Sequence, residues 1–235
     1  DVCKRLLTAG IHLLIEKPAA VTSAEARELA AVADRHSARA CVGHVERFNP
    51  VIQALQRELG DTRILSISFT RVGDMPPRVV DVGVLVDLGV HDIDLLRFIT
   101  ASAIVSATVY SSSTTDSGIE DNANMSFELE GSTLASITTN WLTPFKRRRI
   151  EVTTESGYFD ADLMSQQLSV HSAYQDDNTY LTRTCFVRRG EPLLNELEAF
   201  VRYVRNGDRG DLASIEDSAF TLQLIEHCRE GPYHG

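Results

Sequence analysis

The segment DLGVHDIDLLRF, residues 87–98, carries an aspartate and a histidine at helical spacing. Asp87 and His91 are four positions apart, so on a helix they share one face and can form a hydrogen bond. A carboxylate beside an imidazole orients the ring and raises its basicity, which produces a general base near neutral pH. Leu95 and Leu96 belong to the apolar side that anchors such a helix. This pattern alone favours an ordinary capped helix with His91 on its polar face over a catalytic site.

The first 44 residues predict part of a parallel α/β sheet. Ile11–Ile15 is a short apolar run, typical of a strand that is buried on both faces. Glu16–Lys17–Pro18 follows at the carboxyl end of this strand, where open α/β sheets bind ligands. Around the strand we expect the last turns of a helix at residues 1–9, a helix capped by Ser23, and a second strand at residues 38–43.

The remainder of the chain predicts an antiparallel sheet that carries its helices on one face. Strand-like segments follow one another closely from Arg63 onward, with turns such as the one at residues 130–132 between them. The expected strands are at residues 64–71, 104–110, 122–130, 133–141, 148–154 and 157–160, with shorter ones at 168–170 and 184–187. The expected helices are at residues 48–59, 87–100 and 193–205, the last with an apolar stripe of Leu194, Leu197, Phe200, Val201 and Val204. Ser214 is expected to cap a final helix, and residues 231–235 to be loose.

The composition is that of an ordinary globular protein. The 235 residues are 43% hydrophobic and 24% charged, enough for one large or two modest domains. The formal net charge of −10 argues against a nucleic-acid or anionic-membrane partner, and no apolar run approaches the roughly 20 residues of a membrane span. The four cysteines show no metal-like spacing, and Cys41 and Cys185 lie in apolar runs. We therefore expect buried free thiols and a cytoplasmic location.

Three motifs occur in order along the chain: Glu16–Lys17–Pro18, GHVERFNP at residues 43–50, and D-x-G-x-H-D-x-D at residues 87–94. With them, the sequence resembles the glucose-fructose oxidoreductase/inositol dehydrogenase (Gfo/Idh/MocA) family over nearly its whole length. The resemblance implies a partial Rossmann domain at residues 1–44 and, at 45–235, a substrate domain with a large, mostly antiparallel open sheet. Within the family, the segment around Arg47 is similar to sugar-nucleotide 3-dehydrogenases that act on UDP-N-acetylglucosamine.

This resemblance implies an NAD- or NADP-dependent dehydrogenase that moves a hydride between nicotinamide and a secondary hydroxyl of a sugar, cyclitol or sugar nucleotide. Lys17 would lie between nicotinamide and substrate and stabilise charge on the reacting oxygen. His91 would accept the hydroxyl proton, and Asp87 would orient His91 or share a proton relay; helix capping by Asp87 is nearly as well supported. Glu16, Lys17 and Pro18 would shape the nicotinamide pocket.

Two arginines are candidate substrate-binding residues, each with an alternative. Arg47 can approach the substrate or form a surface ion pair with Glu46 or Asp61. Arg71 and Arg78 flank a loop, and guanidinium groups there suit a diphosphate; an ordinary polar loop is equally well supported.

Other polar residues have weaker indications. Asn140 and Trp141 end a strand and are candidates to line a sugar pocket, although tryptophan is more often part of a core. The basic run at residues 146–149 suits a phosphate, but protection of a strand edge is the favoured explanation. Asp92 and Asp94 are expected to bond the local backbone or an arginine.

The sequence also departs from the family pattern. It contains no Gly-x-Gly-x-x-Gly, so the phosphate-binding end of a Rossmann fold is expected to lie upstream of Asp1. This absence keeps open a second function, a non-catalytic sugar-binding or dimerising module. A metal-dependent hydrolase built on Asp87, His91 and Asp94 is disfavoured, because no further cluster supplies ligands, and we expect no metal.

The predicted sheet also suggests a partner. An antiparallel sheet with helices on one face leaves the other face uncovered, and we expect this face to be apolar. Such a surface predicts a homodimer or homotetramer, as the resemblance to the family also implies.

Overall fold

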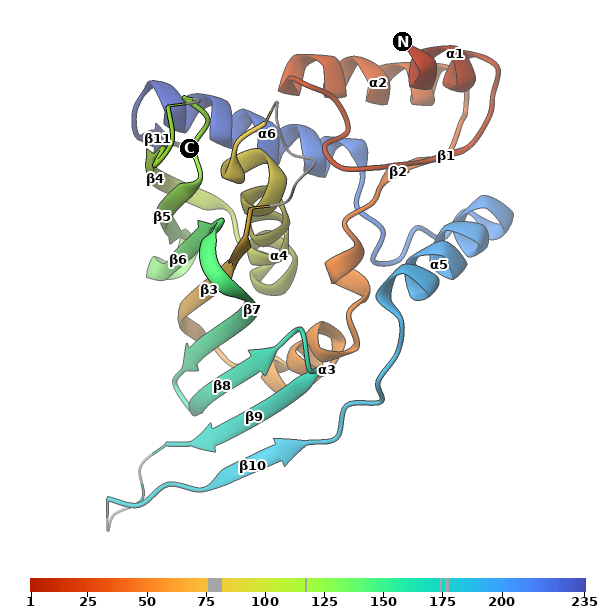
Figure 1. The fold of residues 1–235 in the computed structure, drawn as a ribbon. Helices are drawn as coiled ribbons and strands as arrows, with labels where there is room; N and C mark the ends of the chain where they lie inside the picture. The colour runs from red at the N-terminus through yellow and green to blue at the C-terminus, as the bar shows by residue number, and fades with distance from the viewer. Residues whose placement is uncertain (76–81, 117, 174, 176–177) are drawn as a thin grey trace.

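The computed structural model describes residues 1–75, 82–116, 118–173, 175 and 178–235. It contains a small parallel sheet near the N-terminus and a large sheet that fills the rest of the molecule (Figure 1). The small sheet pairs β1 (Leu13–Ile15) with β2 (Ala40–Val42), accompanied by α1 (Val2–Thr8) and α2 (Ser23–Arg35). The predicted fold class, a partial parallel α/β unit followed by a large and mostly antiparallel sheet, is confirmed.

Helix α2 begins one residue earlier than its predicted cap implies. Thr22, not Ser23, is the cap: its hydroxyl accepts a hydrogen bond from the Glu25 backbone N–H at 3.2 Å, and the Glu25 carboxylate accepts one from the Thr22 N–H. A glutamate three residues after the cap closes this reciprocal box, which Ser23 would not have. Ser23 instead donates its hydroxyl hydrogen to Glu226 of α6 (Ile215–Glu230), 2.6 Å away.

The large sheet has nine strands among the described residues, in the order β10-β9-β8-β7-β3-β6-β5-β4-β11. Neighbouring strands are antiparallel except for β3 and β6, which are parallel. The strand bounds are β3 Ile64–Asp74, β4 Ile104–Ser112, β5 Asn122–Leu129, β6 Thr133–Asn140, β7 Leu142–Thr154, β8 Gly157–Asp162, β9 Gln167–Ser172, β10 Thr182–Cys185 and β11 Tyr233–His234.

The prediction of a loose tail is wrong. Tyr233 and His234 pair with Ala107 and Ser106 of β4, and the Gly235 N–H donates to the Val105 carbonyl at 2.8 Å. The tail therefore satisfies backbone groups at the edge of the sheet, which would otherwise be unpaired.

Three helices cover one face of this sheet (Figure 1). They are α3 (Pro50–Leu59), α4 (Val90–Thr100) and α6, and a 3-10 turn at Val45–Phe48 leads into α3. The core places side chains such as Phe69 and Met125 of the sheet against Leu55 and Leu95 of the helices. Burial of a side chain of this size contributes about 1.5–3 kcal/mol. This shared core holds the start of α4, which carries His91, close to the end of β1.

Helix α5 (Pro192–Asn206) turns only part of the predicted apolar stripe inward, because Phe200 of that stripe packs against the core. Leu194, Leu197 and Val201 of the predicted stripe are 45–54% exposed, whereas Glu196 and Ala199 are buried. Ala199 packs with Cys41 and Phe48, and these close neighbours favour a small residue.

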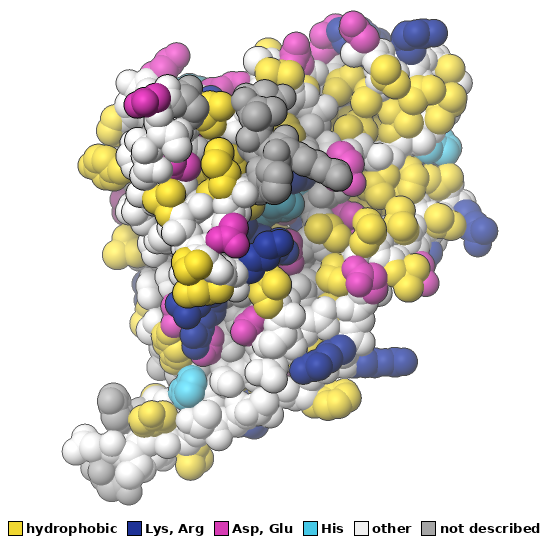
Figure 2. Space-filling view, viewed as in Figure 1, with side chains coloured by type: hydrophobic (Ala, Val, Ile, Leu, Met, Phe, Trp, Pro, Cys, Tyr) yellow, Lys and Arg dark blue, Asp and Glu magenta, His cyan; other side chains and the backbone are white. Residues whose placement is uncertain are grey.

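Figure 2 shows other hydrophobic side chains gathered at the upper right, where Figure 1 places the N-terminal segment.

The outer face of the large sheet is polar, contrary to the prediction. Its outward positions alternate with the buried core residues and include Ser66, Ser68, Ser126 and Ser136. Large apolar side chains also occur among the outward positions, including Leu134, which is 61% exposed, and Tyr110, which is 73% exposed. Because the apolar half of each strand is used against the helices, an apolar outer surface does not supply the expected interface. Self-association through this face stays a prediction.

The two sheets are joined through the last helix. Helix α6 packs on α2, and Val42 of β2 forms a bridge with Ala213 just before α6. The predicted domain boundary near residue 45 stays a prediction, because the second segment supplies part of the packing of the first. In the described ranges, no helix has both the length and the apolar character that a membrane span requires.

Candidate active site

Two cavities meet at the end of β1. One has a volume of about 240 Å³, and its lining includes Arg71, Asp87, Trp141 and Lys146; we call it the cationic cavity. The other has a volume of about 530 Å³, and its lining includes Glu16, Glu46, Glu191 and Glu196; we call it the acidic cavity. Three residues line both cavities: Lys17, His91 and Arg148. Figure 2 shows the hollow near the middle of this face, where basic, acidic and histidine side chains gather.

Lys17 reaches this junction from the carboxyl end of β1, and its peptide bond to Pro18 is cis. Its Nζ donates hydrogen bonds to the Asp87 carboxylate at 3.0 Å and to the Asp87 carbonyl at 2.5 Å. The two residues are 70 positions apart, so this contact joins the small sheet to the segment before α4. It fixes a positive charge at the cavity wall, where it can stabilise negative charge that develops on a bound oxygen.

The predicted hydrogen bond between Asp87 and His91 is absent, and the prediction was wrong. Asp87 lies in a π-helical turn, Leu85–Gly89, in which i→i+5 bonding disturbs the alignment of residues four apart. Lys17 takes the carboxylate instead. The Nδ1 atom of His91 is buried without a hydrogen-bond partner among the described residues.

The imidazole of His91 is therefore less basic than the sequence suggested. Burial, followed by the positive charges of Arg71 and Lys17, holds its pKa well below the usual value. At neutral pH the ring is uncharged and can accept a proton. The neighbouring ring of His44 lies 6.2 Å away, centroid to centroid and nearly perpendicular, and has no hydrogen bond of its own in the described part of the chain.

Two buried arginines brace the site. Arg71 is 3% exposed and donates to Asp92 at 2.8–3.0 Å and to Glu46 at 3.0 Å. Arg47 donates to Asp94 at 2.5 and 2.8 Å. The prediction that Asp92 and Asp94 bind arginines is confirmed, whereas the predicted surface ion pair of Arg47 is wrong.

These pairings change the assignment of the candidate substrate-binding residues. Arg71 lines the cationic cavity but spends its hydrogen bonds on carboxylates, and Arg47 lines neither cavity. Arg148 contacts Glu46 at 2.8 Å and remains partly exposed, next to Lys146 in the same cavity. The basic run, which the sequence favoured as edge protection, thus contributes to the wall of the site. Arg78 lies outside the described residues.

Of the two predicted residues at the end of a strand, Asn140 and Trp141, one lines a cavity and the other does not. Trp141 lines the cationic cavity, and its buried indole Nε1 has no hydrogen-bond partner in the described ranges. Asn140 lines neither cavity; its Oδ1 accepts hydrogen bonds from the Leu142 N–H at 3.2 Å and the Thr143 hydroxyl at 2.9 Å. Trp141 thus lies on the wall of the cationic cavity, whereas Asn140 shapes a turn.

Glu196 was missed by the sequence reasoning. It is 2% exposed and lines the acidic cavity, and its Oε1 has no hydrogen-bond partner among the described residues. Burial, together with the negative charges of Glu16 and Asp94, raises its pKa to about 7. Residues 191–198 include two other glutamates, which are exposed, and nothing in the sequence distinguished Glu196 from them.

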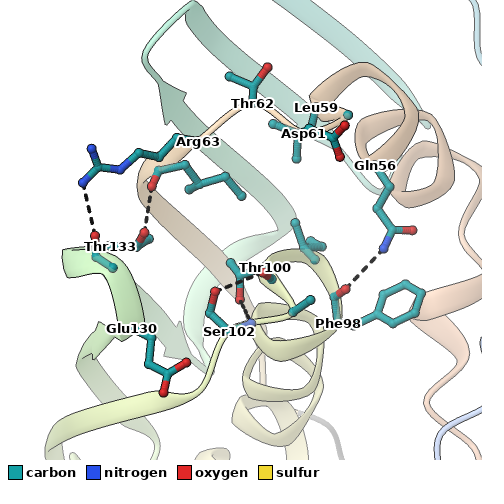
Figure 3. Close-up of a pocket in the computed structure, with 15 residues that line it drawn as sticks. Gln56, Leu59, Asp61, Thr62, Arg63, Phe98, Thr100, Ser102, Glu130 and Thr133 are labelled. Carbon is teal, nitrogen blue, oxygen red and sulfur yellow. Dashed lines mark hydrogen bonds between the residues drawn. The ribbon is translucent and has the colours of Figure 1, made fainter.

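A third cavity, shown in Figure 3, provides a contrast. It has a volume of about 480 Å³ and lies between the end of α3, the end of α4 and the start of β3. Several of its polar groups bond within the protein: Gln56 donates to the Phe98 carbonyl at 3.2 Å, Thr133 to the Ile64 carbonyl at 2.7 Å, and Arg63 to the Gly131 carbonyl at 3.2 Å. At the Lys17–His91 junction, by comparison, His91, Trp141 and Glu196 each have a buried polar atom without a hydrogen-bond partner among the described residues. Buried polar groups normally find a partner, so these atoms distinguish the junction from the third cavity.

No group of three or more His, Cys, Asp or Glu side chains in the described ranges is arranged to hold a metal ion.

Comparison with known families finds two adjoining matches. Residues 1–44 match the description "Oxidoreductase family, NAD-binding Rossmann fold", and residues 53–160 match "GFO/IDH/MocA C-terminal domain". These ranges contain Lys17, Asp87 and His91.

Individual relatives are more distant. The chain is 29% identical over 172 residues to a UDP-N-acetylglucosamine 3-dehydrogenase of Acidithiobacillus ferrooxidans, covering 72% of this chain and 54% of that protein. It is 24% identical over 222 residues to an inositol 2-dehydrogenase of Rhizobium meliloti, covering 88% of this chain and 67% of that protein. The chain therefore spans about half the length of the first of these relatives.

Solved structures show the same fold. The Acidithiobacillus ferrooxidans enzyme superposes with a TM-score of 0.87 at 23% identity, over 97% of this chain and 74% of that chain. An aldose-aldose oxidoreductase from Caulobacter crescentus superposes with a TM-score of 0.84 at 18% identity, over 100% of this chain and 75% of that chain.

Proposed function

Because the chain belongs to the Gfo/Idh/MocA family of NAD-binding oxidoreductases, we propose that it catalyses hydride transfer between NAD or NADP and a secondary hydroxyl of a sugar, cyclitol or sugar nucleotide. The observation that carries this proposal is the convergence of Lys17 and His91. Lys17 follows β1 of the small sheet and His91 lies on α4, yet they line the same two cavities. A catalytic pair must reach one reacting hydroxyl group, and this arrangement permits it.

In the oxidation direction, the imidazole of His91, which lines both cavities, accepts the proton of the substrate hydroxyl. Lys17 donates a hydrogen bond from Nζ to the same oxygen and stabilises the negative charge that develops there. Glu16, Lys17 and Pro18 would hold the nicotinamide, which would supply the acceptor for the hydride of the carbon that bears this oxygen, so that the alcohol becomes a ketone. In the reduction direction, the protonated His91 returns its proton to the oxygen.

Asp87 acts through Lys17 in this scheme. Its carboxylate and carbonyl both accept hydrogen bonds from Nζ, so they hold the ammonium group at the cavity wall. The proposed role of Asp87 therefore shifts from orienting His91 to positioning Lys17. Glu16 and Pro18, on either side of Lys17, are proposed to shape the nicotinamide pocket.

A sugar nucleotide is the substrate class that we favour. Lys146 and Arg148 bring positive charge to the cationic cavity, and such groups bind phosphate oxygens well. Trp141 adds an unpaired N–H to the same wall. The names of the relatives include a UDP-N-acetylglucosamine 3-dehydrogenase, and we extend that reaction, oxidation at the 3-position of a UDP-N-acetylhexosamine, to this protein as a proposal.

The test is an absorbance assay of the protein in its full natural length. NAD and NADP are each offered with UDP-N-acetylglucosamine and with myo-inositol, and Lys17→Met is assayed beside the wild type. We expect reduction of one cofactor with at least one substrate, and its loss in Lys17→Met. Ligand binding without any turnover would instead support a non-catalytic sugar-binding module, and neither binding nor turnover would contradict the proposal.

We also propose that two copies pair through the outer face of the large sheet, as a homodimer or within a homotetramer. The middle of the face supports this by the short side chains of Ser68, Ser126 and Ser136 and by the exposed Leu134 of β6, which allow close approach of two sheets. Arg149, Glu151 and Asp160 add charges to the same face on β7 and β8. Light scattering at micromolar concentration should report more than one copy, and Leu134→Arg should lower the mass. A monomeric wild type would contradict the proposal.

A further inference from the structure

Glu196 occupies an unusual position on the wall of the acidic cavity. It projects from the second turn of α5 and is 2% exposed, yet its Oε1 finds no hydrogen-bond donor in the described part of the chain. A buried polar atom left unpaired costs roughly 1–3 kcal/mol, so the fold gains nothing from this carboxyl group.

The nearby cations are already engaged with other carboxylates. Lys17 is paired with Asp87 at 3.0 Å, and Arg148 with Glu46 at 2.8 Å. The charges that act on Glu196 are those of Glu16 and Asp94, which are negative and oppose its ionisation. The protein therefore supplies neither a donor nor a compensating positive charge for Oε1.

We propose that Glu196 is a specificity-determining residue that hydrogen-bonds an O–H or N–H group of a polyhydroxylated ligand held against Lys17 and His91. This inference rests on the proposed function, because it assumes that a sugar or cyclitol ring enters the junction of the two cavities. Glu196 lines the same cavity as Lys17 and His91, so one ring can contact all three residues.

The carboxyl groups of the acidic cavity determine which part of the ligand binds there. A carboxyl group whose pKa is near 7 is present in both protonation states at neutral pH, so it can accept or donate a hydrogen bond. Glu16, Glu46 and Glu191 line the same cavity and disfavour an anionic group there. The acidic cavity thus receives a neutral ring with hydroxyl or amide groups, and a phosphate or carboxylate is directed to the cationic cavity.

The test compares Glu196→Leu and Glu196→Gln with Glu198→Leu, an exposed position two residues along the same helix, in the full-length protein. KM and kcat are measured with UDP-N-acetylglucosamine and with myo-inositol. Loss of one hydrogen bond between the Glu196 carboxyl group and the substrate costs about 1.5 kcal/mol of binding free energy. KM should therefore rise about tenfold in Glu196→Leu with both substrates. We expect kcat to change less than KM, because the contact is to a part of the ring that does not react.

The other variants separate recognition from structure. Glu196→Gln keeps a donor and an acceptor, so its KM should stay near that of the wild type, and Glu198→Leu should change neither constant. A uronate form of the sugar nucleotide should gain affinity relative to the neutral sugar in Glu196→Gln. The inference is overturned if Glu196→Leu and Glu196→Gln both keep the wild-type KM while Lys17→Met abolishes turnover. A wild type that neither binds nor turns over these substrates overturns the proposed function, and this inference with it.

Discussion

The two cavities share Lys17 and His91 but differ in how their charges are balanced. In the cationic cavity, Arg71 is matched by Asp92 and Glu46, and Lys146 adds positive charge at the rim. In the acidic cavity, Glu196 has no cation and no hydrogen-bond donor among the described residues. The difference shows that the buried charge of Arg71 in the cationic cavity is paired within the protein, whereas Glu196 in the acidic cavity is available to a ligand. A ligand with a neutral ring and an anionic extension matches both sides.

The largest expected effect is at the shared junction. His91→Ala should lower kcat by about 10²–10⁴-fold with every substrate, because loss of a general base costs this much. The effect should be the same for ligands that use one cavity or both. If His91→Ala retains turnover, another group must act as the general base. The junction shared by the two cavities would then not depend on His91 for catalysis.

The pH profile sharpens this prediction. Burial and the charges of Arg71 and Lys17 lower the pKa of His91, so the ring is deprotonated and competent as a base well into the acidic range. The acidic limb of kcat/KM for oxidation should therefore lie below the ordinary histidine value of about 6.5. An acidic limb above that value would show that the imidazole is instead stabilised in its charged form.

A second prediction concerns the acidic cavity: the raised pKa of Glu196 should make the free energy of unfolding depend on pH. The pKa of Glu196 rises from 4.5 to about 7 on folding, so the native state binds more protons than the unfolded state between these values. Stability is consequently lost as the pH rises through this window, by up to about 3 kcal/mol. Glu196→Gln removes this dependence, so it should be more stabilising relative to wild type at about pH 8 than at about pH 4.

Urea unfolding of both proteins at the two pH values measures the difference. Glu198→Gln is the matched control, because this exposed neighbour on α5 should show no comparable change. Equal effects of Glu196→Gln at both pH values would mean that the carboxyl group is not held in its protonated form by the cavity.

The smallest expected effect is at the cationic cavity. Lys146 is exposed and has no recorded ion pair in the described ranges, so its ammonium group is available to a phosphate. Lys146→Met should raise the KM for UDP-N-acetylglucosamine by about five- to tenfold, since a partly exposed charge contact is worth about 1 kcal/mol. The KM for myo-inositol, which carries no phosphate, should not change. An equal rise in KM for UDP-N-acetylglucosamine and myo-inositol would show that Lys146 does not bind the phosphate groups specifically.

The sequence predicted those parts of the molecule in which local pattern and function coincide. The apolar run before Glu16–Lys17–Pro18 identified β1, and helical spacing identified the buried sides of α3 and α6. The pairing of Asp92 and Asp94 with arginines also followed, because buried carboxylates need such partners.

The parts that it missed depend on neighbours distant in the chain. Lys17 takes the Asp87 carboxylate from 70 positions away, and local spacing favoured His91 instead. The buried side of α5 is set by its packing against Cys41 and Phe48, so Leu194, Leu197 and Val201 face outward and Glu196 faces inward. A one-dimensional pattern cannot identify a residue whose role arises from tertiary contacts alone.

The most direct measurement is a crystal structure of the full-length protein with the oxidised cofactor and UDP-N-acetylglucosamine. We predict that the oxygen of the reacting hydroxyl group lies within about 3 Å of both Lys17 Nζ and the His91 imidazole, the distance that proton transfer requires. Glu196 should contact a second hydroxyl or the amide, with the diphosphate near Lys146. A ligand bound elsewhere, or one whose reacting oxygen reaches neither Lys17 nor His91, would contradict the account.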